Sequence, residues 1–222
     1  MSTINTYFDN LQAVLARTLD TQQDAMEQSA RVIADCLKAG GMVRLCPILD
    51  EKLMLHVSAA GSTLEERKEE WVDTLLERYP IKAGDVLISI SNSGRNAVPV
   101  LLAKEAQKRG AFVIALTSLN HTKAVSSRNS LGLRLFETAD LVLDNGGVLG
   151  DASVSFPDGA MVGPTSTAVG AAMLQAIVCR VKELSLEEGF EADYFRSSNV
   201  DGSDAWNDRL INRYKDIIPG LL

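Results

Sequence analysis

The sequence predicts an α/β fold in which a parallel sheet is covered by helices on both faces. Three short runs, at 86–90, 112–116 and 141–143, are apolar at nearly every position, as expected for strands with both faces buried. Helix-length segments follow or separate these runs. Strands that alternate with helices form parallel sheets, because the chain crosses back over the sheet between one strand and the next.

Length and composition fit one folded domain. We expect a single domain over 1–222, with an N-terminal helical segment (1–39), a sheet core (40–185) and a C-terminal helical segment (186–222). Hydrophobic residues make up 46% of the chain and charged residues 23%, which excludes wholesale disorder.

Charge and patterning exclude several classes of protein. The net charge of −7 argues against non-specific nucleic-acid binding and against docking on anionic membranes. No run of about 18 apolar residues is present, and the first ten residues lack the features of a signal peptide, so we expect a cytoplasmic protein. Cys36, Cys46 and Cys179 are widely spaced in apolar surroundings, so we expect reduced, buried thiols rather than disulfides or a zinc site.

The first 80 residues predict helices around one short strand. Apolar residues at three- and four-residue steps predict helix over 3–39, either as one helix or as two with Asp20 and Thr21 capping the second. Gly40 and Gly41 end this pattern, and a β-type run at 42–46 follows. Ser62 and Glu65 fit a capping box that begins a helix reaching about residue 79.

The rest of the chain alternates more regularly. The strand at 86–90 leads into a small-residue loop and a helix over 97–109, which ends at Gly110. The strands at 112–116 and 141–143 follow, and 151–156 is a candidate for a short extra strand. Two further helices are expected, at 166–184 and 204–214.

The loop after the 86–90 strand carries the sharpest functional signal. In parallel sheets ligands bind beyond the carboxyl ends of the strands, where helix N-termini also point. Small residues let the backbone approach a ligand, hydroxyls donate to phosphate oxygens, and the amides of the next helix favour an anion. The alternative is an ordinary turn, since these residue types also form turns. The phosphate-binding candidates in this loop are Ser91, Asn92, Ser93, Gly94 and Asn96.

Two further hydroxyl clusters follow the same logic. Thr117 and Ser118 come directly after the next strand, and two neighbouring strands that end in hydroxyl-rich loops are better evidence than either one alone. Ser166 and Thr167 lie at the start of a long helix, and we include both in the predicted site. Simple capping of that helix by Thr165 or Ser166 is the alternative.

These motifs, in this order, resemble the SIS (sugar isomerase) domain, and more narrowly its phosphoheptose-isomerase-like branch. The resemblance extends from the first helix to about Tyr214. It is carried by the segments 86–96 and 113–118, with support from 47–51, 144–147, 163–167 and 199–202. It implies a flavodoxin-like three-layer αβα sandwich that binds a phosphorylated sugar through the 91–96 loop. It also implies a homodimer or homotetramer with sites near the subunit interfaces.

One strand–helix unit of that family is missing from this sequence. The family has a central first strand, a Gly-rich loop and a helix directly after the N-terminal helix, whereas here Gly41 passes almost directly into 43–46, which resembles the second strand. Roughly 20–25 residues are absent, judged by ordinary element sizes. Either the sequence lacks a real segment, or 42–46 takes the place of the missing strand. The absent loop normally contributes to the sugar-phosphate site.

Aldose–ketose isomerisation requires a base that moves a proton between adjacent carbons. Glu65 and His121 are the catalytic candidates, the first at a helix start and the second after the 117–118 loop. Helix capping by Glu65 and a solvated loop position for His121 are the alternatives. Glu66, His56 and the pair Asp50–Glu51 are further acid–base candidates.

The sequence has no metal-ligand spacing, P-loop or dinucleotide fingerprint, so we expect no metal and no cofactor. The interpretation that fits best is a phosphosugar-binding protein that isomerises its ligand. A non-catalytic phosphosugar sensor and a lyase acting on an ether-linked amino-sugar phosphate are the alternatives.

Overall fold

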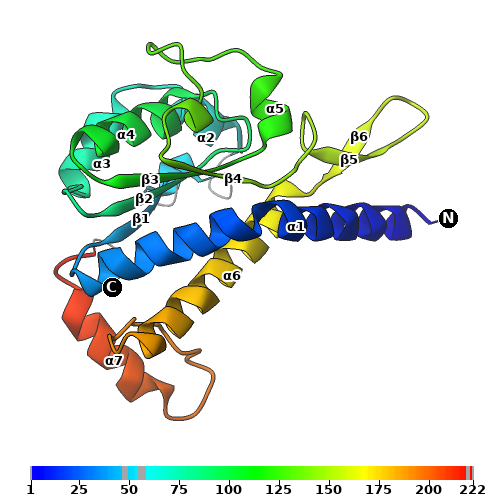
Figure 1. Cartoon of the computed structure of the whole chain (residues 1–222). Helices are drawn as coiled ribbons and strands as arrows, with labels where there is room; N and C mark the ends of the chain where they lie inside the picture. Colours follow the sequence, from blue (N-terminus) through cyan, green and yellow to red (C-terminus); the bar gives the residue numbers. More distant parts are fainter. Residues whose placement is uncertain (1, 47–49, 55–58, 219–220, 222) are drawn as a thin grey trace.

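The computed structural model describes residues 2–46, 50–54, 59–218 and 221. Its centre is a sheet of four parallel strands in the order β1-β2-β3-β4, shown in Figure 1. The strands are β1 (Val43–Cys46), β2 (Val86–Ile90), β3 (Phe112–Thr117) and β4 (Leu141–Asp144). β2, β3 and β4 were expected from their apolar runs, and β1 from the β-type run at 42–46.

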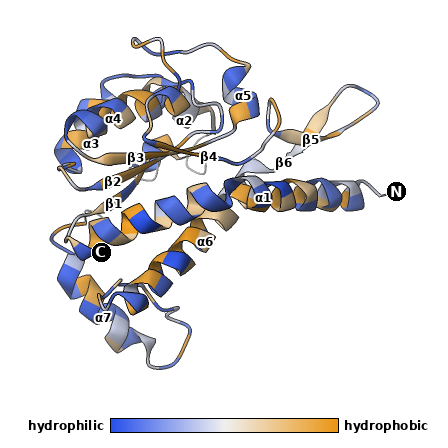
Figure 2. Cartoon of the chain, viewed as in Figure 1, coloured by the Kyte–Doolittle hydropathy of each residue, from blue (hydrophilic) through white to orange (hydrophobic). Residues whose placement is uncertain are grey.

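Helices cover both faces of this sheet, which confirms the predicted α/β fold. α1 (Thr3–Lys38) and α6 (Ser166–Glu187) pack on one face, and α2 (Ala59–Glu65), α3 (Trp71–Arg78) and α4 (Ala97–Lys108) lie on the other (Figure 1). Side chains alternate between the two cores along each strand: Val86 and Ile88 join the α1–α6 core, whereas Leu87 joins the α4 core. Figure 2 shows β3, at the centre of the sheet, as largely apolar.

α1 is one continuous helix of 36 residues, so the alternative of two helices is wrong. The hydroxyl of Thr21 bonds back to the carbonyl of Arg17 at 2.8 Å and does not cap a new helix. The helix begins at an N-cap, Ser2, whose side chain accepts from the amide of Ile4. It ends where the amide of Gly41 bonds to the carbonyl of Cys36.

The helix expected from Ser62 to about residue 79 is two helices. Ser62 lies inside α2, and the chain turns between Glu65 and Trp71 before α3 begins. The carbonyl of Glu66 accepts from the amide of Val98 at 3.0 Å, a long-range bond that replaces a bond within the helix. The expected capping box at Ser62 is therefore wrong.

β1 pairs directly with β2, in the register Val43↔Val86 to Cys46↔Ser89. In the described part of the chain, no strand pairs with the other edge of β1. The run at 42–46 therefore stands directly next to β2, at the edge of the described sheet. The segment 47–49, part of the motif after β1, lies outside the described residues.

α5 and the β5–β6 hairpin lie beyond the carboxyl ends of the strands, whereas α7 lies at the far end of α6 (Figure 1). α5 (Leu119–Lys123) is a short helix where only a polar loop was expected. β5 (Ala152–Ser155) was expected, but its antiparallel partner β6 (Met161–Pro164) was not. Tyr7 of α1 donates to the carbonyl of Pro164, and this hairpin lies beside the N-terminal part of α1 in Figure 1. α7 (Ser203–Tyr214) follows α6. None of the described helices is long and apolar enough to cross a membrane.

Candidate functional site

Hydrogen bonds of its backbone fix the shape of the loop between β2 and α4. Gly94 has a φ of 57°, and its amide donates to the hydroxyl of Ser91 at 3.2 Å. The carbonyl of Asn92 accepts from the amide of Ser118 at 3.1 Å, which fixes the loop against the end of β3. The hydroxyl of Ser93 makes no hydrogen bond among the described residues and is partly exposed, so it is available to a ligand.

Positive charge borders this loop. Arg95 follows Gly94, and its carbonyl accepts from the amide of Arg128 at 2.8 Å, which draws the two arginine residues together. Burial lowers the pKa of Arg95, and the charges of Arg128 and Arg67 lower it further. No carboxylate forms an ion pair with these three guanidinium groups within the described ranges. The positive electrostatic potential of these arginines beside Ser93 therefore favours the binding of an anion.

Thr117 and Ser118 support the loops rather than face a ligand. Both side chains are fully buried. The hydroxyl of Thr117 donates to the carbonyl of Asn92 at 3.2 Å, and that of Ser118 donates to the carbonyl of Gly147 at 2.6 Å. Ser118 also caps α5 by accepting from the amide of His121. Their direct partners are thus internal backbone groups.

The start of α6 already carries an internal anion. The carboxylate of Asp151 accepts from the amides of Thr165 and Ser166 at 3.2 and 3.0 Å, and from the hydroxyl of Ser166. Asp151 is the one described non-glycine residue with a positive φ, 66°. The hydroxyl of Ser166 is therefore occupied, while Thr167 is exposed on the first turn of the helix.

The structure does bring three of the predicted clusters to one place, around Gly147. A Cβ added at Gly147 would lie 3.5 Å from Asp151 Oδ1 and 3.7 Å from Asn92 Oδ1. The carbonyl of Gly147 accepts from Ser118, and Asn92 Oδ1 accepts from Asn145 at 3.0 Å. The 91–96 loop, the 117–118 loop and the start of α6 thus meet beyond the carboxyl ends of β2, β3 and β4.

The two neighbouring glutamates have different environments. Glu65 bonds Lys68 at 2.6 Å and Trp71 at 2.7 Å, and these contacts lower its pKa. Glu66 accepts from Asn96 of the 91–96 loop at 3.0 Å, and burial raises the pKa of Glu66. Glu66 also lies close enough to Cys46, at the end of β1, to raise the pKa of that thiol, although burial is the larger cause. Of these two glutamates, Glu66 is therefore the one that contacts the 91–96 loop, whereas Glu65 contacts Lys68 and Trp71.

Asn96 links that carboxylate to the loop. It lies at the N-cap position of α4 without a side-chain capping bond, and its Oδ1 is buried with no partner among the described residues. His121 on α5 lies near both Asp151 and Arg95, and its Nδ1 is likewise buried and without a partner in the described part of the chain. Burial lowers the pKa of His121, and nearby Asp151 opposes this shift. His56 lies outside the described residues.

Comparison with known proteins identifies the family. The sequence pattern of the SIS domain matches residues 38–118. A UPF0309 protein of Listeria monocytogenes serotype 4b (strain F2365) is 36% identical over 242 aligned positions, which cover 98% of this chain and 98% of that protein. The chain belongs to the UPF0309 family. The predicted resemblance to SIS domains is confirmed.

Solved structures similar to this UPF0309 chain share its fold at low sequence identity. A phosphoheptose isomerase of Neisseria gonorrhoeae has a TM-score of 0.52 and 16% identity, with 83% of this chain and 97% of that chain covered. A phosphoheptose isomerase of Francisella tularensis has a TM-score of 0.51 and 17% identity, with 84% of this chain and 100% of that chain covered. These similarities show a shared fold.

The alignment also measures what this UPF0309 chain lacks. The 242 positions aligned with the Listeria relative include 98% of these 222 residues, or about 218, so about 24 positions pair a residue of the relative with a gap. That number matches the one strand–helix unit that the sequence predicted to be missing.

Proposed function

We infer that this chain binds a phosphorylated sugar beyond the carboxyl ends of β2, β3 and β4 and isomerises it between aldose and ketose forms. The observation that carries this inference is the pairing of two features on one loop. The 91–96 loop presents an unoccupied hydroxyl, Ser93, next to positive charge, and the same loop holds a half-buried carboxylate, Glu66, through Asn96.

The phosphate is expected at the turn from β2 into α4. Gly94 brings the backbone close to a ligand, α4 begins at Ala97 directly after the loop, and the hydroxyl of Ser93 donates to a phosphate oxygen. Arg95 and Arg128 add positive charge without neutralising partners among the described residues. Thr117 and Ser118 contribute by fixing the loop in this shape, and Thr167 extends the polar surface on the opposite side.

Proton transfer is assigned to Glu66 and His121. A carboxylate whose pKa is raised by burial is a better general base near neutral pH than one at its ordinary value. His121, whose pKa is lowered by burial, is neutral near pH 7 and can exchange a proton with a sugar oxygen. Glu65 takes no part in this scheme, because Lys68 and Trp71 occupy its carboxylate.

Calorimetric titration with a panel of heptose, hexosamine and N-acetylmuramic acid phosphates tests the binding step. Ser93→Ala removes one hydrogen bond to a charged group, which corresponds to roughly a 10- to 100-fold weaker Kd. Ser155→Ala is the matched control, because Ser155 is exposed and makes no side-chain hydrogen bond in the described structure. Equal affinities of the two variants, or no binding of any phosphosugar, would refute the proposed site.

Exchange of solvent deuterium into the bound sugar tests the chemical step. An isomerase that removes the proton beside the carbonyl incorporates deuterium there, and Glu66→Gln abolishes this while phosphate binding persists. Binding without exchange in the wild type would indicate a phosphosugar sensor, and release of lactate from an N-acetylmuramic acid phosphate would indicate an ether lyase. Either result would refute the isomerase assignment.

A further inference from the structure

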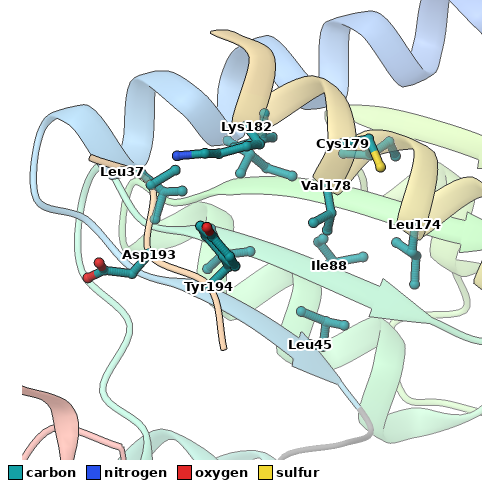
Figure 3. Close-up of a pocket in the computed structure, with 14 residues that line it drawn as sticks. Leu37, Leu45, Ile88, Leu174, Val178, Cys179, Lys182, Asp193 and Tyr194 are labelled. Carbon is teal, nitrogen blue, oxygen red and sulfur yellow. The ribbon is translucent and has the colours of Figure 1, made fainter. Parts of the chain in front are cut away.

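An apolar groove lies between the sheet and α6, on the face of the sheet that α1 and α6 cover. Its volume is about 620 Å³, within the range of small-molecule pockets. Leu45 of β1 and Ile88 of β2 form one wall, and Leu174 and Val178 of α6 form the opposite wall (Figure 3). Tyr194, in the segment between α6 and α7, closes one end.

The apolar part of the groove is long enough for a single hydrocarbon chain. α6 lines it from Leu174 to Lys182, so this wall is about 12 Å long. Val178, halfway along the wall, is 56% exposed. Covering such an apolar wall removes it from water and stabilises whatever covers it. A straight, medium-length alkyl chain laid along α6 would do so.

The closed end of the groove carries hydrogen-bond donors that lack an acceptor. The ammonium of Lys182 lies 5.3 Å from the centre of the Tyr194 ring (Figure 3). Neither this ammonium nor the hydroxyl of Tyr194 has a hydrogen-bond or ion-pair partner among the described residues. Asp193, which also lines this end, already accepts from Arg213 at 2.9 Å and from Tyr214 at 2.6 Å. One positive charge is therefore left without compensation.

These features match a molecule that has an apolar tail and one negative charge at its head. A carboxylate at the closed end would pair with Lys182 and accept from the hydroxyl of Tyr194, and such charge-assisted bonds are the stronger kind. A phosphate monoester carries about two negative charges near pH 7, more than one ammonium balances. A sugar would leave hydroxyl groups without partners against the apolar walls.

We propose that the groove binds a free medium-chain fatty acid. Its carboxylate lies at Lys182 and Tyr194, and its alkyl chain runs along α6 toward Leu174. The free acid is favoured over a membrane lipid, because the net charge of −7 disfavours contact with an anionic bilayer. The groove shares no residue with the candidate phosphosugar site, so this inference goes beyond the function proposed above and does not depend on it.

The test uses the full chain with octanoate, decanoate and dodecanoate, each below the concentration at which it forms micelles. Calorimetric titration should give one site, with Kd lowered about fourfold for each added methylene group. Cys179 provides a second readout, because it lines the groove and is exposed, whereas Cys36 and Cys46 are buried. We expect saturating decanoate to slow the alkylation of Cys179 at least tenfold. Mass spectrometry of the peptides assigns the modified cysteine.

A neutral substitution at Lys182 tests the head group separately from the tail. Lys182→Met keeps the apolar stem and should weaken decanoate binding about tenfold, the loss expected for one bond between charged groups. It should leave the binding of decanol unchanged, because this alcohol has the same chain length and no charge. Lys104→Met is the matched control and should change neither affinity, because Lys104 is a partly buried lysine of α4, on the other face of the sheet.

A charge on the groove wall tests the position of the tail. Val178→Asp should abolish binding, whereas Leu186→Asp on the same helix should not, because Leu186 is 72% exposed and does not line the groove. Circular dichroism verifies that the variants fold. The proposal is overturned if decanoate does not bind, if it binds without protecting Cys179, or if Lys182→Met does not weaken decanoate more than decanol. It is also overturned if Cys179 becomes protected as the protein concentration rises without fatty acid, which would identify a second copy of the chain as the occupant.

Discussion

Replacing Gly94 by alanine tests how tightly the phosphate loop is packed. The residue has a φ of 57°, and a Cβ built there lies 2.8 Å from Thr122 Oγ1, 3.2 Å from Thr117 Oγ1 and 3.3 Å from the Cβ of Leu135. All three neighbours are fully buried, so none of them can move away into solvent. The added methyl group therefore meets a rigid wall in a backbone conformation that alanine disfavours.

The loss of folding stability expected for Gly94→Ala has two parts, and the control variant Gly132→Ala separates them. The left-handed backbone costs alanine about 1–2 kcal/mol, and overpacking a buried site costs about 1–3 kcal/mol. We therefore expect Gly94→Ala to lower the free energy of unfolding by roughly 2–5 kcal/mol. Gly132 has a φ of 67° with nothing within 4 Å of its built Cβ, so Gly132→Ala carries only the first part. At this chain length, 1 kcal/mol lowers Tm by about 2–4 °C.

Urea and thermal unfolding followed by circular dichroism measure both variants. Adding Thr122→Ala to Gly94→Ala removes the nearest clash and recovers part of the loss. Adding Thr122→Val recovers nothing, since a methyl group replaces the hydroxyl. Phosphosugar binding is lost in Gly94→Ala and retained in Gly132→Ala. If the two glycine variants lose equal stability, the packing of the loop against the threonines is wrong, and so is the argument that this packing shapes the phosphate site.

Other substitutions have equally specific expectations. Burial raises the pKa of Glu66 above its ordinary value of 4.5, so folding carries a penalty that is absent below that pH and grows as pH rises through the folded-state pKa. Glu66→Gln should therefore gain stability over the wild type as pH increases; a constant difference in urea midpoints contradicts this. Glu65→Gln should retain deuterium exchange within about threefold, because the described partners of that side chain are Lys68 and Trp71, away from the loop. Asp151→Ala should cost roughly 1–2 kcal/mol in thermal unfolding by uncapping α6, and an unchanged Tm would count against that role. Burial raises the pKa of Cys46 to about 12, so iodoacetamide should modify Cys179 well before Cys46 by peptide mass mapping.

The central sheet was predictable because its strands are buried on both faces. Such strands are recognisable as continuous apolar runs whatever their neighbours are, and β2 begins and ends where the run at 86–90 does. α6 was likewise expected from its apolar periodicity and extends three residues further than predicted, to Glu187. These elements are specified by local sequence, so the fold class followed from the sequence alone.

The errors arose where long-range contacts override local patterns. The helix expected after Ser62 stops at Glu65, because the next carbonyl is taken by Val98 from α4. The choice between Glu65 and Glu66 depends on the same turn, which sends one carboxylate to Lys68 and the other to the phosphate loop. Asp151 was missed as a site residue because its partners lie 14 and 15 positions along the chain.

The missing strand–helix unit affects the two parts of the site differently. The contacts that shape the phosphate loop come from β3 and the segments after it: Ser118 bonds Asn92, and Leu135 bonds Gly94 at 2.8 Å. None of these contacts involves β1, so phosphate binding should not depend on the residues that the relatives carry before it. Glu66, by contrast, lies near Cys46 at the end of β1, directly after the shortened connection from α1. We therefore expect phosphate affinity and sugar turnover to be separable in this chain, with turnover the more sensitive of the two to the shortened N-terminal region.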